Sequence, residues 1–326
     1  MLRLSHFSQE IDDAVARVQS GDLRGALATL EQCCQRTGAD LTSEAYWRYH
    51  LVRLQVLGYL GHAAQCEALL DTELAADPPT PELAVALHIL RGASYCRRTR
   101  YKESKELLHR ALELASQLGL KALEAEAHVR CGQLCQGLEQ HEESEAHFLA
   151  ASEIARSLGD RYLEAIAAAG QGKNIMRSGS FVEATEHFRK VQQTLNELGE
   201  RLLADMLHGQ IAWGYINQGN YDAALETLLL AEPALRDAGV KQSHAICLAD
   251  MGYIHMQRGE HSKAVSYYQQ ALDTDKICCN PVLFRKWSNN IAAAYAKLGD
   301  TANQQKHSEA VARHDASMAQ RRAEIG

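Results

Sequence analysis

The chain has 326 residues and carries 34 Lys and Arg against 41 Asp and Glu, a formal net charge of −7. This balance, without a concentrated basic stretch, argues against direct binding to nucleic acid, because phosphate neutralisation needs clustered Lys and Arg. The N-terminal residues lack the apolar core of a signal peptide, and no run approaches the roughly 18 apolar residues of a membrane span. We therefore expect a cytoplasmic protein that does not engage a membrane.

Helix-forming residues dominate the sequence from end to end. Ala, Leu, Glu and Gln are abundant, and only five prolines occur, namely Pro78, Pro79, Pro81, Pro233 and Pro281. Few prolines and many strong helix formers favour helix over strand almost everywhere. No linker rich in Pro, Gly and Ser divides the chain, so we expect one elongated all-α unit over residues 1–326.

A period of 40 residues runs through the sequence. Gly119, Gly159, Gly199 and Gly239 stand 40 residues apart, and each follows a helical stretch. Glycine suits the end of a helix because it adopts left-handed dihedral angles without steric cost. A fixed period of 20 to 50 residues is typical of stacked helical repeats, so it decides the expected fold.

Small and bulky residues alternate at fixed places within each 40-residue unit. The eighth place, counted from Val85, is small in every copy: Gly92, Gly132, Gly172, Ala212 and Gly252. The twenty-fourth place is bulky: Leu108, Phe148, Phe188, Leu228 and Tyr268. Small residues at the eighth place let two helices approach closely, and the spacings of 3 and 4 residues around these places define one helical face.

This pattern resembles the tetratricopeptide repeat family, and the 40-residue unit is similar to the arrays of bacterial signalling regulators and spindle-orientation adaptors. The resemblance is strongest from Val85 to Gln305. It implies a right-handed superhelical solenoid of about eight antiparallel helix pairs with a concave inner surface. The expected repeats are 7–46, 47–84, 85–124, 125–164, 165–204, 205–244, 245–284 and 285–306, followed by a C-terminal capping or connector helix over 307–326. Pro233 falls inside a predicted helix and should kink it or end it early.

The resemblance also implies which side chains face a bound segment, because the first helix of each pair turns fixed positions toward the inner surface. From residue 165 onward these positions carry large apolar side chains with a mixed polar rim. Such a composition is typical of an interaction hot spot. The candidate partner-binding residues are Ile166, Lys173, Met176, Arg177, Met206, Gln210, Trp213, Ile216, Ile246, Asp250, Tyr253, Met256, Lys286 and Asn290.

From this strip we expect a scaffold or adaptor that holds a helical or extended segment of another protein by apolar anchors. The alternative is a sensory, regulatory module that binds a signalling peptide or small molecule and relays it to an effector domain or partner. A third reading leaves the strip without a ligand, since tightly curled helices could pack these side chains against one another. The oligomeric state, and whether the chain is part of a longer protein, stay open.

No motif indicates an enzyme. The sequence contains neither a glycine-rich phosphate-binding loop nor the helix motif of zinc proteases, and it lacks the nucleophile elbow of serine hydrolases. We therefore expect no catalytic residues and no cofactor.

The nine cysteines are expected to be reduced thiols that bind no metal. His128, Cys131 and Cys135 fall on one helix and could supply three ligands to zinc. The repeat register, however, turns these positions toward the partner helix, which favours packing. The adjacent pairs Cys33–Cys34 and Cys278–Cys279 do not have the spacing of a metal or redox site.

Overall fold

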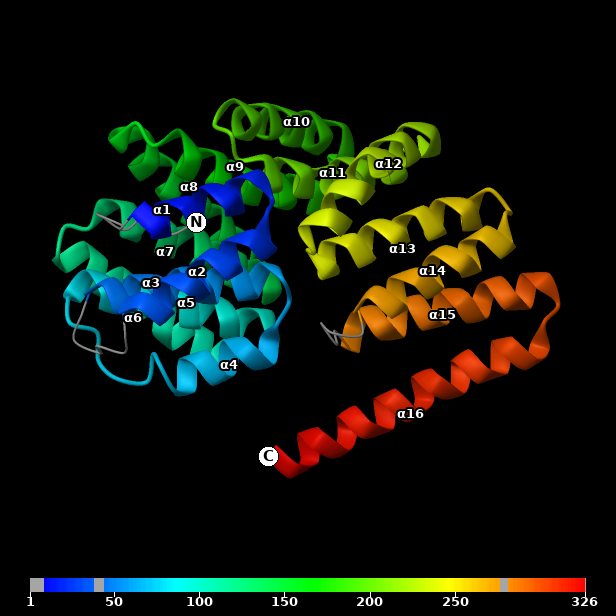
Figure 1. The fold of residues 1–326 in the computed structure, drawn as a ribbon. Helices are drawn as coiled ribbons and strands as arrows, with labels where there is room; N and C mark the ends of the chain where they lie inside the picture. The colour runs from blue at the N-terminus through cyan, green and yellow to red at the C-terminus, as the bar shows by residue number, and fades with distance from the viewer. Residues whose placement is uncertain (1–8, 38–43, 276–280, 326) are drawn as a thin grey trace. The chain divides into compact units, whose positions relative to one another are not determined.

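In the computed structural model, which describes residues 9–37, 44–275 and 281–325, the chain folds into sixteen α-helices. Consecutive helices pack as antiparallel pairs (Figure 1), which confirms the all-α, tetratricopeptide-like solenoid. The helices are α1 (Gln9–Ser20), α2 (Leu23–Thr37), α3 (Glu44–Tyr59), α4 (Ala63–Asp71), α5 (Pro81–Arg97), α6 (Tyr101–Gln117), α7 (Lys121–Gly137), α8 (His141–Leu158), α9 (Arg161–Arg177), α10 (Phe181–Glu197), α11 (Arg201–Asn217), α12 (Tyr221–Ala238), α13 (Lys241–Gln257), α14 (His261–Asp275), α15 (Pro281–Leu298) and α16 (Thr301–Ile325).

The helices form two compact units. Unit 1 is Met1–Gly214 and unit 2 is Tyr215–Gly326, so the boundary falls within α11. Inside each unit most helices pack on the next one in the chain. First helices of some successive pairs also contact each other, as α5 contacts α7 and α13 contacts α15. The stretch 307–325, expected to be a cap or connector, continues α16.

The turns between helices share one backbone geometry. The glycines predicted to end second helices all lie in the left-handed region, with φ of 69° at Gly119, 66° at Gly159, 77° at Gly199 and 75° at Gly239. After Gly119, the N–H of Leu120 bonds to the carbonyl of Ala115 at 2.9 Å, so the turn recovers a carbonyl left open at the helix end.

The turns inside the helix pairs use the same conformation, halfway between those glycines. Gly179, Gly219 and Gly259 have φ of 86°, 73° and 75°, while Thr99 and Glu139 hold φ of 60° and 61° at the equivalent places without being glycine. The 40-residue repeat is thus two similar halves of 20 residues. Non-glycine residues rarely adopt this conformation because Cβ crowds the backbone, so these two turns are strained.

Close contact between a glycine and a ring sets the distance within each pair. A Cβ added at Gly132 would lie 2.8 Å from the Phe148 ring, and one at Gly172 would lie 2.7 Å from the Phe188 ring. The eighth and twenty-fourth places therefore lie against each other in these pairs, a contact that the sequence pattern had not specified. The sequence did not reveal that the Ser144 hydroxyl also donates a buried hydrogen bond of 3.1 Å to the Gly132 carbonyl.

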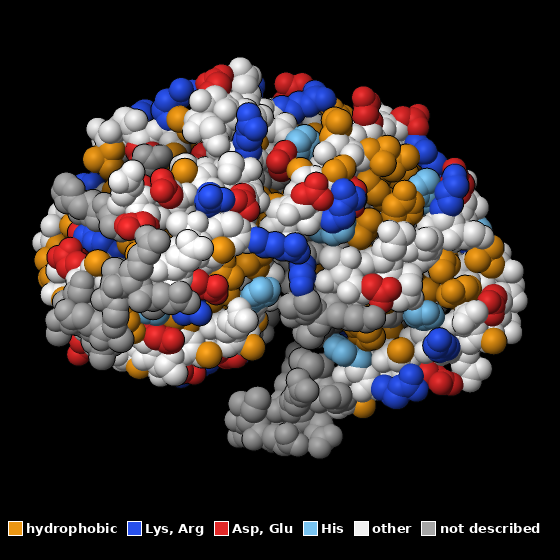
Figure 2. Space-filling model, in the orientation of Figure 1, with side chains coloured by type: hydrophobic (Ala, Val, Ile, Leu, Met, Phe, Trp, Pro, Cys, Tyr) orange, Lys and Arg blue, Asp and Glu red, His pale blue; other side chains and the backbone are white. Residues whose placement is uncertain are grey.

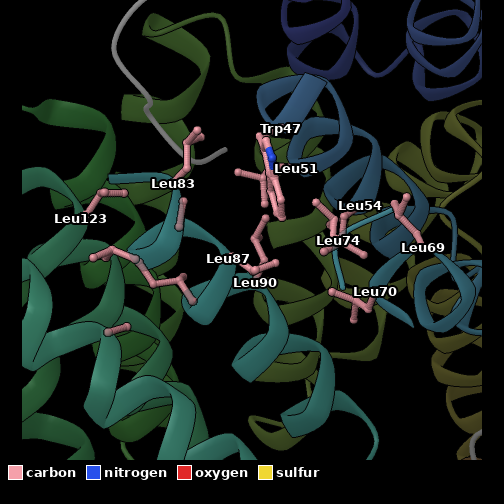
Figure 3. Close-up of a cluster of buried hydrophobic side chains, with 14 of the residues drawn as sticks. Trp47, Leu51, Leu54, Leu69, Leu70, Leu74, Leu83, Leu87, Leu90 and Leu123 are labelled. Atoms are coloured by element: carbon pink, nitrogen blue, oxygen red, sulfur yellow. The ribbon is translucent and has the colours of Figure 1, made fainter. Parts of the chain in front are cut away.

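Each pair completes its core with side chains of the next pair. In unit 1, Trp47 and Leu51 of α3 cluster with Leu70 of α4 and with Leu83 and Leu87 of α5 (Figure 3), and all are almost fully buried. The same principle holds in unit 2, where α13, α14 and α15 supply a shared cluster. Mutual burial of this kind is the main source of stability in helical repeats.

Of the two outcomes expected for Pro233, an early helix end does not occur, because α12 continues through it to Ala238. A proline removes the hydrogen bond to the carbonyl four residues earlier. Here that residue is Leu229, whose side chain is 55% exposed, and Pro233 is exposed as well. This side of the helix faces solvent, where water can bond to the released carbonyl.

Relieving the two strained turns should stabilise the protein. We expect Thr99→Gly and Glu139→Gly each to raise the free energy of unfolding by about 0.5–1 kcal/mol, because glycine removes the Cβ conflict at positive φ. Gly119→Ala should lower the free energy of unfolding by a similar amount. An added Cβ there meets no atom within 4 Å, so the cost comes only from the strain of a non-glycine residue at positive φ. Urea unfolding measures all three, and a loss of stability in both glycine variants would contradict the strain.

A methyl group added at Gly170 should destabilise the core of unit 1. A Cβ there would clash with the buried ring of Phe148, so Gly170→Ala should destabilise the protein by about 1–3 kcal/mol. Gly209 is the matched control, because it also lies in a first helix but an added Cβ meets nothing within 4 Å. Gly209→Ala should stabilise by about 0.5–1 kcal/mol through helix propensity. Equal effects in thermal unfolding would show that the ring contact does not constrain the fold.

Candidate functional site

The first helices of unit 1 enclose a common interior. Gln19 of α1 donates a hydrogen bond of 2.8 Å to the Glu200 carboxylate, in the turn before α11, although the two residues stand 181 positions apart. Glu200 is itself only 6% exposed. The end of unit 1 therefore lies beside its first helix. Between Gln19 and Glu200 the sequence contains the first helices α3, α5, α7 and α9.

Charged and phenolic side chains from successive helices gather in this interior. Tyr59 ends α3, and burial raises its pKa, while the charges of Arg130, Glu126, Glu200 and Arg97 all act on it. These groups come from α3, α5, α7 and the turn before α11. Their mutual influence shows that side chains far apart in sequence face one space.

Four cations belong to this interior, and we refer to Arg97, Arg130, Lys173 and Arg177 as the inner basic cluster. Arg130 forms an ion pair with the buried Glu126 one turn earlier on α7. The guanidinium of Arg177 donates to the Gln136 carbonyl at 2.7 Å. These contacts hold two of the four cations against α7.

The other two cations, Arg97 and Lys173, make no hydrogen bond or ion pair with any described residue. Burial lowers the pKa of both. The positive charge of Arg130 lowers the pKa of Arg97 further, and Arg177 and Arg130 do the same to Lys173. Yet the Arg97 side chain is exposed and that of Lys173 is partly exposed, so the space is enclosed without being packed shut.

In unit 1 the predicted strip divides between packing and open surface. Met176 is 7% exposed, and Ile166 packs against the cluster of Val129 and Phe148. The others stay partly or fully exposed, namely Lys173, Arg177, Met206, Gln210 and Trp213. Their part in binding stays a prediction.

In unit 2 more of the predicted strip lies in the core. Ile216 is 5% exposed and Asp250 is 8% exposed. Ile246, Tyr253 and Met256 pack against the buried cluster that includes Tyr268 and Trp287. Lys286 is exposed and Asn290 partly exposed. Packing of the strip's own side chains, left open by the sequence, therefore accounts for several apolar positions here.

Asp250 is a carboxyl group enclosed by unit 2. Burial raises its pKa to about 7, and the positive charge of Lys286 partly opposes this rise. A carboxylate with a pKa this high is unfavourable in its charged form, because it has left water without full compensation.

Sequence reasoning missed the residues of the inner basic cluster that lie before residue 165. Arg97 and Tyr59 occupy the thirteenth place of their repeats, and Glu126 and Arg130 occupy the second and sixth places. All of these places belong to the set of inner positions that also gave Lys173, at the ninth place, and Arg177, at the thirteenth. Applying the register to the earlier repeats would have found them.

The three residues considered as zinc ligands, His128, Cys131 and Cys135, lie packed within the protein. The Nδ1 atoms of His128 and His147 lie 3.0 Å apart, and burial lowers the pKa of His147 to about 4. Cys131 is buried, which raises its thiol pKa to about 12, and Cys135 is buried too. Across the described residues, no three His, Cys, Asp or Glu side chains are placed to hold a metal ion. The side chains of Cys34, Cys278 and Cys279 lie outside the described part.

On the face drawn in Figure 2, acidic and basic side chains are interspersed rather than gathered by sign. Among the helices of the described ranges, none combines the length and apolar character that a bilayer crossing demands.

Paired helices, repeated left-handed turns and an inner surface of polar side chains define the chain as a helical-repeat protein of the solenoid class. Sequence models of the tetratricopeptide repeat match residues 82–157 and 248–278. Both matched segments are therefore tetratricopeptide repeats. A search of curated proteins finds no match.

Several solved structures share the fold. A Rap protein complexed with competence and sporulation factor superposes with a TM-score of 0.66 at 11% identity, covering 95% of this chain and 98% of that one. NprR in complex with its cognate peptide NprX gives 0.62 at 14% identity, covering 91% and 85%. Aspartyl phosphate phosphatase F from Bacillus subtilis gives 0.54 at 13%, covering 97% and 96%. At such low identities the likeness establishes the fold alone.

Neutralising Asp250 should stabilise the protein at high pH. Because the folded pKa of about 7 lies above the ordinary value of 3.8, the stability that protonated Asp250 contributes is complete below pH 4 and is lost as the pH rises through 7. Asp250→Asn should therefore raise the free energy of unfolding by about 2–4 kcal/mol at pH 8 and by much less at pH 4.5. Asp237→Asn, at a side chain 73% exposed, is the control. Urea unfolding at both pH values is the measurement, and a pH-independent difference would contradict the burial of the charge.

Proposed function

We propose that this protein is a non-enzymatic regulator that binds a peptide, or a peptide-like segment of a partner protein, on the inner surface of unit 1. The observation that carries the proposal is a pair of inner cations that no described residue pairs. Arg97 and Lys173 have no partner among the described residues, and both remain accessible to solvent. A protein core does not leave such groups unsatisfied, whereas a binding surface does.

Apolar side chains beside these cations supply the anchors that a peptide requires. Met206 and Trp213 lie on α11 and are partly exposed, and Ile166 on α9 shows part of its side chain. Tryptophan and arginine are enriched among the residues that dominate binding energy, and methionine adapts to irregular surfaces. The surface therefore offers both apolar contact and charge.

The likeness to NprR with NprX and to a Rap protein with its factor supports a peptide as the ligand class. A peptide ligand is compatible with both hypotheses from the sequence. A scaffold that holds a protein segment and a sensor that binds a signalling peptide would use the same inner surface. Binding rather than catalysis is also favoured by the buried thiols. The pKa values of Cys131 and Cys247 rise to about 12, so neither is a nucleophilic thiolate near neutral pH.

A displayed library of random peptides tests the proposal. Selection on the purified protein should enrich related sequences that bind the native chain. Trp213→Ala and Met206→Ala should each weaken those peptides at least tenfold, which corresponds to about 1.4 kcal/mol. Leu230→Ala, at a side chain 67% exposed on the second helix α12, is the matched apolar control and should bind normally.

Circular dichroism and melting temperature must first show that the variants keep their fold. If no sequence is enriched, or if all variants bind the enriched peptides equally, unit 1 does not bind peptides through this surface.

A further inference from the structure

We infer that His128 and His147 form a binding site for a divalent transition-metal ion such as Zn²⁺, which bridges the two helices of the fourth pair. His128 lies in α7 and His147 in α8. The inference uses none of the residues assigned to peptide binding, so it stands or falls independently of the proposed function.

The two imidazoles already meet at atoms that bind metals. Their Nδ1 atoms lie 3.0 Å apart, and the ring centroids are 5.2 Å apart. Two nitrogens on one tetrahedral zinc ion, each about 2.0–2.1 Å from the metal, are separated by about 3.3 Å. A small rotation of either ring therefore brings both nitrogens to the separation that a shared ion requires.

The same contact shows that the rings are not both charged. One ring donates a proton from Nδ1, and the other accepts it at an Nδ1 lone pair, so at least one imidazole is neutral. Burial lowers the pKa of both rings, that of His147 to about 4, and the charges of His128 and His109 lower the pKa of His147 further. Near neutral pH both imidazoles are in the form that binds a metal, without competition from protons.

A carboxylate stands one turn from each imidazole. Glu124 precedes His128 by four residues on α7, and Glu143 precedes His147 by four residues on α8. Side chains at this spacing are neighbours on a helix, and the charge of each glutamate acts on its own histidine. Glu124 also forms an ion pair with Lys121. Because the two helices are antiparallel, the carboxylates flank the imidazole pair from opposite ends, where their negative charge favours a cation.

Two nitrogens leave the remaining positions of the ion open. Within the described ranges no third His, Cys, Asp or Glu side chain is placed to complete the site, so water fills these positions. His128 and His147 are partly exposed, which gives the ion access. Glu143 and His109 are exposed, and a change of rotamer at either would supply a third ligand. The site is therefore expected to bind reversibly, unlike a closed structural zinc site.

Neighbouring repeats lack such a pair at the equivalent places. In the fifth pair, His187 of α10 corresponds to His147, but Ala168 of α9 stands where α7 has His128. The Nε2 of His187 lies 2.8 Å from the Ala168 carbonyl oxygen instead. His187 is thus a matched control, because it has the same setting without a second imidazole.

Thermal unfolding of the tag-free protein, with and without Zn²⁺, tests the site. Submillimolar Zn²⁺ should raise the melting temperature of the native protein by about 2–5 °C, because the two ligands are held together only in the folded pair. The rise should be lost in His128→Gln and in His147→Gln and should persist in His187→Gln, each compared with its own metal-free state. Mg²⁺, which prefers oxygen ligands, should have no effect. No rise in the native protein, or an equal rise in all four proteins, would overturn the inference.

Titration calorimetry on the native protein separates the imidazoles from the thiols and needs no variant to fold. Burial raises the thiol pKa of Cys131 to about 12 and raises that of Cys135, so zinc binding by these thiols would release protons at pH 7. The imidazole pair releases none, because the Nδ1 proton moves to Nε2 of the same ring. We expect a binding enthalpy that is equal in two buffers of different ionisation enthalpy. Release of one proton or more per ion would assign the metal to cysteine and overturn the inference.

Discussion

Several helix pairs of this protein depend on a glycine, because the absence of its Cβ leaves room for a bulky side chain of the second helix. In the fourth pair, Gly132 of α7 lies against the Phe148 ring. Gly170 of α9, in the following pair, lies against the same ring. One aromatic side chain thus fixes the distance within a pair and between pairs. Because the ring cannot move without opening the core, every inner position inherits a defined place, and this is how a string of short helices presents a precise surface.

The inner surface of unit 1 follows from that regularity. Stacking carries the chain until Gln19 meets Glu200, so the first helices turn their inner positions toward one interior. Three of these helices place Arg97, Arg130 and Lys173 there, and the charge of Arg130 acts on the other two.

The sequence predicted what depends on local rules and missed what depends on stacking. The 40-residue period and the left-handed glycines are local, because each needs only one helix pair. The 20-residue half-period escaped notice since Thr99 and Glu139 take the left-handed conformation without glycine. The burial of Ile216 and Asp250 depends on how neighbouring pairs cover them, which a repeat register alone does not contain. The repeat register predicts inner positions for the earlier cations of the inner basic cluster as well. The prediction of a binding strip began at residue 165 because large apolar side chains occupy the inner positions from there on.

The two units use the same inner positions differently. In unit 2, Ile246 and Met256 pack against the local core, and Asp250 is enclosed with a pKa near 7. In unit 1, other inner positions carry cations, and of these Arg97 and Lys173 remain accessible. Apolar side chains at inner positions can satisfy one another, so they bring the pairs together and close the space. Like charges repel one another and cannot pack in this way. Charge at the inner positions therefore distinguishes unit 1 from unit 2.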